Sequence, residues 1–398
     1  MAGRRVLLSL VLIAACAAPA QPPGQLSPSP TPAASTLPPT ATVVPTASPS
    51  ALPTSVPSPT AGQTAAPTDG ASPAPTGGLT PAPTGGALPD ALAWSRLDLT
   101  GGPSAREDHT WTLSADGASA YLYGGRARGA ALGDLWRYDL ATDTWSRLEP
   151  ASPPPARWGH VAAWHDLVGL LIWSGQASAD AFFDDIWAYD PQADAWQPLP
   201  SGGPLPIARY GSCGGIGPDG RLWVSHGFTH DEGRFRDTRA YDVASGQWAD
   251  VTPASGPVER CLHDCLWTSD GRLVLYAGQT TGLPALGDLW TYDPTTNAWT
   301  EQPPGPPPAR QLYALAGAGE SAYVFGGGDV DGGYLDDLWR LSLSDLAWTQ
   351  VALTGEGPSA RAGAAFIFDA ERGRLLLFGG QRRAGELDDL WVLAAAGG

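Results

Sequence analysis

The sequence predicts an all-β fold built from six copies of one unit, because two residue series keep nearly the same spacing. Both series lie in the last 305 of the 398 residues, with intervals of 49 to 52 residues. The arginines are Arg106, Arg157, Arg209, Arg260, Arg310 and Arg361, and the tryptophans are Trp145, Trp196, Trp248, Trp299 and Trp348. A repeat of about fifty residues is typical of architectures in which each unit buries its apolar face against its neighbours.

Each unit is predicted to form four short antiparallel strands. Short apolar runs such as residues 120–123 and 273–276 are separated by turn residues such as those at 218–220 and 269–271. Short apolar runs separated by turn residues indicate strands that are joined in sequence order. One unit therefore folds as a four-stranded meander.

The six units are predicted to close into a ring. The last unit ends after its third strand, at residues 389–393, while residues 94–97 precede the first unit and are identical to residues 145–148, the fourth strand of that unit. A strand from the amino-terminal side would complete the last sheet and remove the open edges.

The repeats resemble the kelch family of β-propellers over residues 94–398. The resemblance rests on the glycine pairs at 124–125, 326–327 and 379–380, on the Asp-Leu-Trp elements at 134–136, 288–290, 337–339 and 389–391, and on the tryptophan series. It implies a six-bladed propeller. In these blades we expect the tryptophans to fill the space between sheets, the glycine pairs to permit close backbone approach, and the aspartates to bond local backbone.

The first ninety residues are predicted to export and tether the propeller. Residues 1–15 read as a signal peptide with arginines at 4 and 5 and an apolar core too short to span a bilayer. The ending Ile13-Ala14-Ala15-Cys16 resembles the lipobox of bacterial lipoproteins, which implies a lipid on Cys16 and a location at the bacterial cell surface, on the outer side of the cytoplasmic membrane. The alternative is an ordinary signal peptide with an incidental cysteine.

A linker follows the predicted lipid anchor. Residues 17–90 contain 19 prolines, two charged residues, and runs of Ser, Thr and Ala. Such a segment buries too little apolar area to offset its chain entropy, so residues 16–90 are expected to form a disordered stalk and residues 91–398 the propeller.

The net charge of −17 argues against a nucleic-acid partner, because phosphate backbones are bound by excess positive charge. The chain has no lysine, so each basic group in it is a terminal amine, a histidine or an arginine. The six repeated arginines are expected near one mouth of the central channel, where kelch adaptors are known to grip acidic peptides with arginines. The other interpretation is that each arginine pairs within its own or the next blade, as recurrence in every unit favours.

The candidate ligand contacts lie at the same mouth. They comprise the six repeated arginines, together with Trp158, Tyr210, Phe228 and His230. Blade three departs most from the repeat, since Asp237-Thr-Arg239 replaces Asp-Leu-Trp and His226 replaces a glycine, so its loop at 228–236 is the first choice for a specific contact. An ordinary polar rim is the alternative.

No catalytic or metal constellation and no cofactor site is predicted. The histidines at 109, 160 and 263 follow their arginines by three residues, as in kelch repeats without metal, and the acidic groups near 230 and 330 match no regular metal site. Cys213 and Cys265 have opposite strand parity at similar height in neighbouring blades, so they are a candidate disulfide. The alternative is that they are small core residues.

The sequence therefore predicts a surface-anchored binding protein for an unknown protein or glycan, held at the membrane only through its lipid. The first alternative is an exported sugar mutarotase or sialate-processing enzyme, which some kelch propellers resemble. The second is a structural surface module without enzymatic activity.

Overall fold

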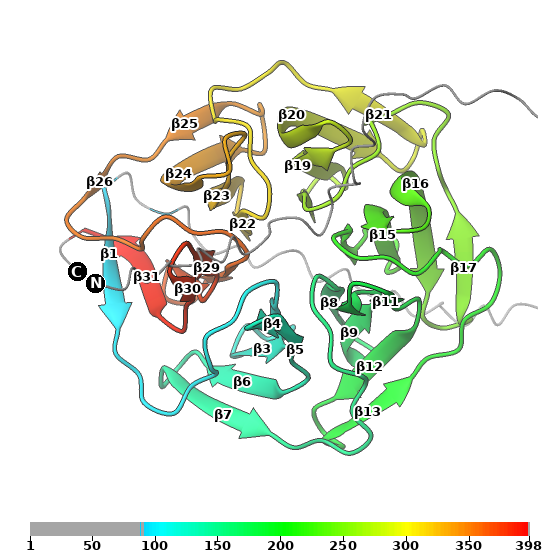
Figure 1. Cartoon of the computed structure of the whole chain (residues 1–398), viewed down its shortest axis with the longest axis horizontal. Coiled ribbons are helices and arrows are strands. Elements are labelled where there is room, and N and C mark those ends of the chain that lie inside the picture. Colours follow the sequence, from blue (N-terminus) through cyan, green and yellow to red (C-terminus); the bar gives the residue numbers. More distant parts are fainter. Residues whose placement is uncertain (1–87, 89–90, 397–398) are drawn as a thin grey trace, which may run out of the picture. The chain divides into compact units, whose positions relative to one another are not determined.

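The computed structural model describes residues 88 and 91–396, which form a ring of six β-sheets around a central axis (Figure 1). Each sheet is a blade whose strands are antiparallel and follow one another from the axis outward. The prediction of an all-β, six-bladed propeller is confirmed. The predicted signal peptide, Cys16 and the predicted linker other than Leu88 lie outside the described residues. Leu88 is buried in the apolar cluster that contains Leu92 and Trp94.

The first three blades run in sequence order from the innermost to the outermost strand. Blade 1 contains β2 (Thr110–Leu113), β3 (Ser119–Tyr123), β6 (Leu135–Asp139) and β7 (Thr144–Leu148). Blade 2 contains β8 (Val161–His165), β9 (Gly169–Trp173), β12 (Ile186–Asp190) and β13 (Ala195–Pro198). Blade 3 contains β14 (Cys213–Ile216), β15 (Leu222–Thr229), β16 (Gly233–Asp242) and β17 (Gln247–Asp250).

The remaining blades repeat this order, and the last takes its outer strand from the other end of the described chain. Blade 4 contains β18 (Asp264–Trp267), β19 (Leu273–Thr280), β20 (Leu283–Asp293) and β21 (Ala298–Glu301). Blade 5 contains β22 (Ala314–Ala318), β23 (Ser321–Gly328), β24 (Tyr334–Ser342) and β25 (Trp348–Gln350). Blade 6 contains β27 (Ala365–Asp369), β28 (Arg374–Phe378), β31 (Leu390–Ala395) and β1 (Leu92–Leu97), with β26 (Leu353–Thr354) added parallel to β1.

The predicted ring closure is confirmed. All six residues of β1 pair antiparallel with β31, from Leu92 opposite Ala395 to Leu97 opposite Leu390. One further backbone bond joins the amide of Ala396 to the carbonyl of Ala91, at 2.9 Å. Closure leaves blade 6 with the same strand order as the other blades, so every blade has two neighbours (Figure 1).

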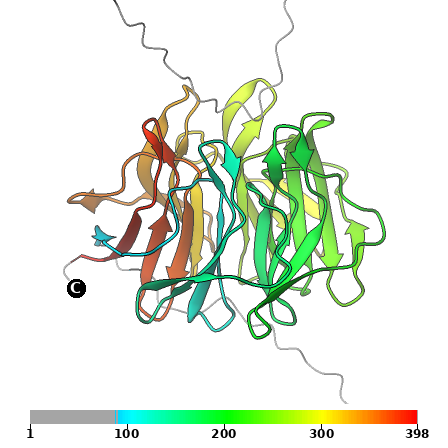
Figure 2. The same ribbon diagram turned by 60° about the horizontal axis from the view of Figure 1, so that its bottom comes forward.

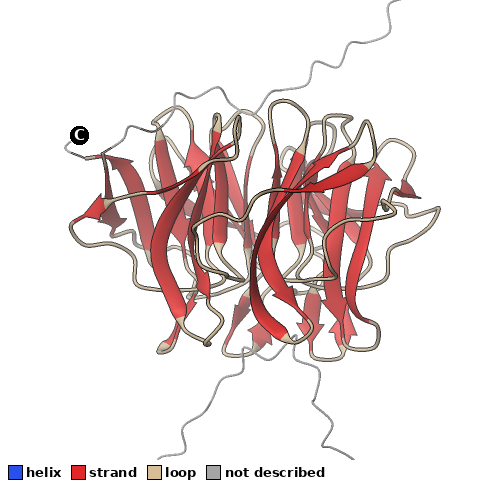
Figure 3. Ribbon diagram, turned by 90° about the horizontal axis from the view of Figure 1, so that it is seen from above, coloured by secondary structure: helices blue, strands red, loops and turns tan. Residues whose placement is uncertain are grey.

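The ring has two faces that differ in their connections. The strands run between these faces (Figures 2 and 3). We call one the loop face, because the hairpins joining second to third strands lie there, together with the ends of the inter-blade connections that lead into the repeated arginines. The other is the turn face, which holds the first-to-second and third-to-fourth turns. The loop-face hairpins of three blades carry short extra strands, namely β4 (Arg126–Ala127), β5 (Ala130–Ala131), β10 (Gln176–Ser178), β11 (Ala181–Phe182), β29 (Gln381–Arg382) and β30 (Gly385–Glu386).

Six apolar clusters of the core are each shared by two neighbouring blades. The cluster between blades 1 and 2, for example, joins Tyr121 and Leu135 to Leu170 and Trp196. A tryptophan of an outer strand belongs to each cluster: Trp94, Trp145, Trp196, Trp248, Trp299 and Trp348. The prediction that the tryptophan series fills the space between sheets is confirmed, and the blades are stable through their contacts with each other.

Candidate functional site: the loop face and the central channel

The six repeated arginines are buried and each is paired within its own blade. Their relative exposure is at most 2%. Each guanidinium donates two hydrogen bonds of 2.5–3.1 Å to one aspartate. The pairs are Arg106–Asp134, Arg157–Asp185, Arg209–Asp237, Arg260–Asp288, Arg310–Asp337 and Arg361–Asp389. The structure therefore assigns these guanidinium groups to holding the blades, and they are not open to a ligand at the channel mouth.

The expected role of the repeated aspartates is wrong in one respect. Their carboxylates accept from the arginine, and usually from the indole nitrogen two residues further on, as Asp389 accepts from Trp391 at 2.7 Å. A buried guanidinium without a carboxylate partner is strongly destabilising. The aspartate carboxylates therefore bond the arginines and not the local backbone. Burial opposes ionisation of Asp389, but the bonds and charge of Arg361 outweigh it and lower the pKa of that carboxyl.

The irregular sequence of blade 3 keeps the same geometry with different atoms. Arg239 stands where other blades have tryptophan, and its Nε donates to Asp237 at 3.0 Å in place of an indole nitrogen. His226 stands where three other blades have glycine and the remaining two have Ser174 and Ala277; its φ is 60°, and its carbonyl accepts from Arg209 at 3.1 Å. At these two positions blade 3 therefore keeps the hydrogen bonds to Asp237 and from Arg209 that hold the blade together, although the residues differ.

A closed ring of hydrogen bonds surrounds the axis directly after the arginines. The residue two positions after each arginine donates its backbone amide to the equivalent carbonyl of the preceding blade, at 2.8–3.0 Å. All six residues have φ between 51° and 68°. They are Asp108, Gly159, Gly211, Leu262, Leu312 and Gly363. This axial ring ties all six blades together at one level.

Glycine pairs supply a second set of bonds between blades. The amide of Gly125 donates to the carbonyl of Arg157 in the next blade, at 2.9 Å, and the equivalent bond recurs at every blade boundary. Gly125 has φ of 100°, and a Cβ there would lie 2.8 Å from the carbonyl of Glu107. The expectation that these glycines permit close backbone approach is confirmed.

Above the axial ring, on the loop-face side, lies a layer of side chains that closes the mouth. In all six blades the residue after the arginine forms an isolated bridge with the residue two positions after the one equivalent to His226, as Tyr210 does with Phe228. Trp158, Tyr210, Phe228, Cys261 and Leu262 form an apolar cluster over blades 2 to 4. Among the proposed aromatic contacts only His230 is exposed, and its ring lies against Phe182 and Phe228.

Over blades 5, 6 and 1 the same layer is polar. Arg126 donates to Glu107 at 2.8 Å and lies 3.7 Å from Asp108. The amide of Gln381 donates to Glu107 and its oxygen accepts from the hydroxyl of Tyr334 at 3.1 Å. Burial raises the pKa of Glu107 to about 8 and the charge of Asp108 adds to this rise, although Arg126 opposes it. The cavity among these groups has about 20 Å³, which is space for about one water molecule.

The groups that a ligand can reach stand on the hairpins and connections of the loop face. Six large apolar side chains are exposed among the described residues, and five of them lie on this face: Leu205, Ile207, Val258, Leu283 and Val330. Exposed charges of both signs accompany them, including Arg128, Arg236, Arg382, Arg383, Asp231, Glu232, Asp331 and Asp336. The sixth apolar residue, Leu167, lies in the β8–β9 turn of the turn face.

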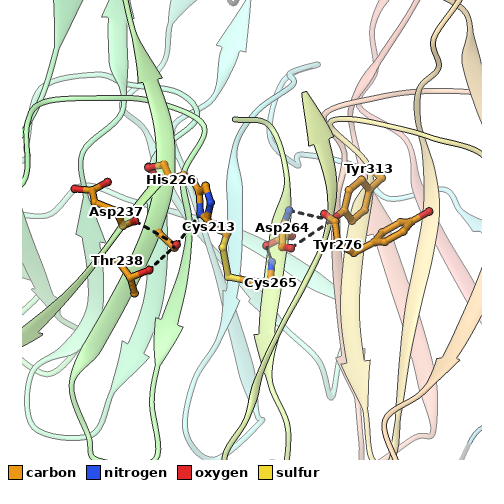
Figure 4. The surroundings of a disulfide bond; sticks show 10 residues. Cys213, His226, Asp237, Thr238, Asp264, Cys265, Tyr276 and Tyr313 are labelled. Carbon is orange, nitrogen blue, oxygen red and sulfur yellow. Dashed lines mark hydrogen bonds between the residues drawn. A yellow bond between two sulfur atoms is a disulfide. The ribbon is translucent and has the colours of Figure 1, made fainter. Parts of the chain in front are cut away.

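A disulfide joins the innermost strands of blades 3 and 4. Cys213 of β14 and Cys265 of β18 are bonded, with Cα atoms 5.6 Å apart and a sequence separation of 52 positions (Figure 4). Cys261 is buried. The bond adds a covalent link to the noncovalent contacts between these two blades.

Reduction of this disulfide is expected to lower the free energy of unfolding by about 2–4 kcal/mol, because a chain of about fifty residues is released in the unfolded state. Urea titrations with and without dithiothreitol measure the difference. The Cys213→Ala/Cys265→Ala double variant is the matched control, since dithiothreitol should leave its midpoint unchanged. A wild-type midpoint insensitive to the reductant would contradict the expectation.

Stability is also expected to fall as pH rises, through Asp264 beside the disulfide. Burial raises the pKa of Asp264 to about 7 from an ordinary 3.8, although a bond from the amide of Cys265 opposes the rise. The folded state then holds the proton more tightly than the unfolded state, so the free energy of unfolding decreases from about pH 4 through about pH 7. Between pH 5 and 7.5 the decrease is roughly 2–3 kcal/mol for this group.

Asp264→Asn is expected to remove that part of the pH dependence, because an amide does not titrate. Denaturation at pH 5 and pH 7.5 measures the slope. Asp336→Asn, at an exposed hairpin position, is the control and should retain the wild-type slope. If Asp264→Asn also retained the wild-type slope, the raised pKa of Asp264 would be wrong.

Two further findings concern the described residues alone. No group of three or more His, Cys, Asp and Glu side chains is placed to hold a metal ion within residues 88 and 91–396. Within the same residues, no helix has the length and apolar character needed to cross a membrane.

Six copies of one blade, closed by a strand from the opposite end of the described chain, define this protein as a β-propeller. Residues 88–278 and 254–396 match the KLHDC2/KLHL20/DRC7 Kelch-repeats domain. The chain belongs to the kelch-repeat family.

The similar proteins come from plants and animals. Acyl-CoA-binding domain-containing protein 4 of Arabidopsis thaliana is 27% identical over 297 residues, which are 70% of this chain and 43% of that protein. Kelch domain-containing protein 3 of Bos taurus is 23% identical over 317 residues, which are 73% and 80% of the two chains. Multiple epidermal growth factor-like domains protein 8 of Mus musculus is 34% identical over 176 residues, which are 42% and 6%. This chain thus spans less than half the length of the plant relative.

Proposed function

We propose that this protein is an exported, lipid-anchored binding protein whose kelch propeller recognises a protein ligand through the loop face. A kelch propeller is typical of protein-binding modules, and its repeats match that family over most of the chain. The proposed contacts move from the buried arginines to the side chains of the loop-face hairpins and connections.

The loop face is proposed as the binding face because of where the exposed apolar side chains lie. Five of the six exposed large apolar side chains in the described residues lie on loop-face segments, where they alternate with charges of both signs. Exposed apolar groups within a polar rim are the usual composition of a protein interface. The turn face offers Leu167 alone from this set.

The tether fits this arrangement. β1 begins at the turn face, where Leu92 pairs with the end of β31, and it runs toward the loop face. In this proposal the linker approaches the ring at the turn-face end of β1, away from the loop face. Lipidation at Cys16 supplies the anchor in this proposal.

Cys16→Ser is expected to move the protein from the membrane fraction to the soluble fraction, and an unchanged distribution would contradict the anchor.

Binding is tested by selecting peptides from a displayed random library against the mature chain and measuring their affinity for variants. Leu283→Asp and Val258→Asp on the loop face are each expected to weaken a selected peptide at least tenfold. Leu167→Asp is the matched control on the turn face and should leave the affinity unchanged.

The opposite pattern would contradict the proposed face. A second outcome is that no peptide is selected, while a glycan array shows binding that Leu283→Asp removes. The ligand would then be a glycan, and the loop face would still be the binding face. Binding weakened equally by Leu167→Asp overturns the face.

A further inference from the structure

The central channel contains a cavity that is separate from the loop face. Its volume is about 230 Å³, and the innermost strands of the blades line it below the axial ring. Tyr210, Leu262 and Leu312 line both this cavity and the small cavity above the ring. These three buried or nearly buried side chains are the partition between them, so the channel cavity is not an extension of the proposed protein-binding face.

The side chain of Asp108 lines this cavity and has no hydrogen-bond partner. It is 2% exposed, and neither carboxylate oxygen accepts a hydrogen bond. Its nearest charged group is Arg126, with Nη2 at 3.7 Å from Oδ2, which is longer than a hydrogen bond. Buried polar groups are normally hydrogen-bonded, so an unsatisfied carboxylate facing a cavity indicates a missing partner.

A second carboxylate lines the cavity from the opposite side of the ring. Asp264 belongs to blade 4 and Asp108 to blade 1, and these blades face each other across the axis (Figure 1). The backbone amide and carbonyl of Asp264 bond with the hydroxyl of Tyr313 (Figure 4), and one oxygen of its carboxylate accepts from the amide of Cys265 at 2.8 Å. Both acids therefore line the same cavity, from blades on opposite sides of the axis.

Among the described residues, the one cation paired with these acids is Arg126, 3.7 Å from Asp108, and it lines the small cavity above the axial ring and not the channel cavity. None of the residues that line the channel cavity is arginine, and the chain has no lysine. Three histidines line it, but burial lowers the pKa of His109, His160 and His263, so their rings are neutral at neutral pH. The repeated arginines are occupied by their own aspartates. The remaining polar lining consists of hydroxyl groups, including those of Thr110, Thr112 and Ser212.

We propose that the channel cavity binds a small organic ammonium ion, with Asp108 and Asp264 as its carboxylate partners. An alkylammonium group brings the positive charge and the hydrogen-bond donors that the cavity lacks. Its carbon chain suits the apolar part of the lining, where Trp111, Leu315 and Phe366 are found. The volume is below the range of about 300–1,000 Å³ typical of sites for drug-sized ligands, so the ligand is a short amine or diamine.

Calorimetric titration of the mature, full-length chain tests this proposal, with ethylammonium and putrescine as probes and sodium chloride at matched ionic strength as the reference. We expect saturable binding at one site per chain. Asp108→Asn is expected to reduce the affinity at least tenfold. Asparagine has nearly the shape of aspartate and tolerates the left-handed backbone at this position, where φ is 54°.

Asp264→Asn tests the opposite wall and should also weaken binding, which keeps the proposal testable if Asp108→Asn does not fold. Asp336→Asn, on an exposed hairpin, is the matched control and should bind like the wild type. The proposal is overturned if neither amine binds saturably, or if both channel variants keep wild-type affinity. Calcium chloride is a separate arm: saturable calcium binding that depends on Asp108, without amine binding, also overturns the assignment of an ammonium ligand. Peptide binding at the loop face is measured independently, so failure here does not affect the proposed function.

Discussion

Deleting residues 91–98 is expected to abolish cooperative unfolding of the propeller. The deletion removes β1, which pairs along all six residues with β31 and buries Leu92 and Trp94 against blades 5 and 6. Removing a buried leucine and a buried tryptophan costs about 5–10 kcal/mol, which is comparable to the whole stability of a typical domain. Urea titration monitored by tryptophan fluorescence should show a broad, early transition in place of a sharp one.

A permuted chain separates the loss of β1 from the loss of the ring. Residues 91–98 can be moved to follow Ala396 through an Asn-Gly turn, because Ala396 and Ala91 already share a backbone hydrogen bond. This permuted chain is expected to recover the wild-type urea midpoint. A deletion variant that unfolds as sharply and at the same midpoint as the wild type would show that closure contributes no stability.

Asp337→Ala is expected to lower the free energy of unfolding by about 3–5 kcal/mol, because it leaves a buried guanidinium without its partner. Asp337 accepts two bonds of 2.8 Å from Arg310 and one of 2.6 Å from Trp339. Arg310 is 0% exposed, so water cannot replace the carboxylate without opening the blade. Urea titration measures the loss.

The adjacent residue supplies the control for this prediction. Asp336 is exposed and has the same side chain, so Asp336→Ala should change the free energy of unfolding by less than about 0.5 kcal/mol. Equal effects of the two substitutions would mean that the pair with Arg310 is not a main source of stability. An Arg310→Met/Asp337→Leu double variant should be less destabilised than Asp337→Ala, since it buries no unpaired charge.

The repeat spacing predicted the fold and its closure, because both follow from patterns that local sequence carries. The partner of each arginine was harder to predict. The aspartates lie 27 or 28 residues further along the chain, and the pairing becomes visible only when the first strand of a blade is placed beside its hairpin. A constant distance between the Arg and Asp series was the available signal. Recurrence in all six blades supported the structural interpretation, and burial of all six arginines agrees with it.

The axial ring and the two carboxylates of the channel were not predicted. Three of the six ring positions are glycine, but Asp108, Leu262 and Leu312 adopt the same left-handed backbone without that signal. Their conformation is imposed by the bonds between blades, which are tertiary contacts that sequence pattern does not show. Likewise, Asp108 and Asp264 lie 156 positions apart in the sequence and share a cavity only because blades 1 and 4 face each other across the ring.

The pairing of β1 with β31 determines how the propeller responds to pulling. β1 begins at the turn face and runs toward the loop face, antiparallel to β31. When a tether pulls on residue 91 while a ligand holds the loop face, the force acts along β1. The backbone bonds along all six paired residues are then loaded together in shear and are not opened one at a time. Strand closure therefore places the mechanically stronger geometry at β1, on which the proposed tether would pull.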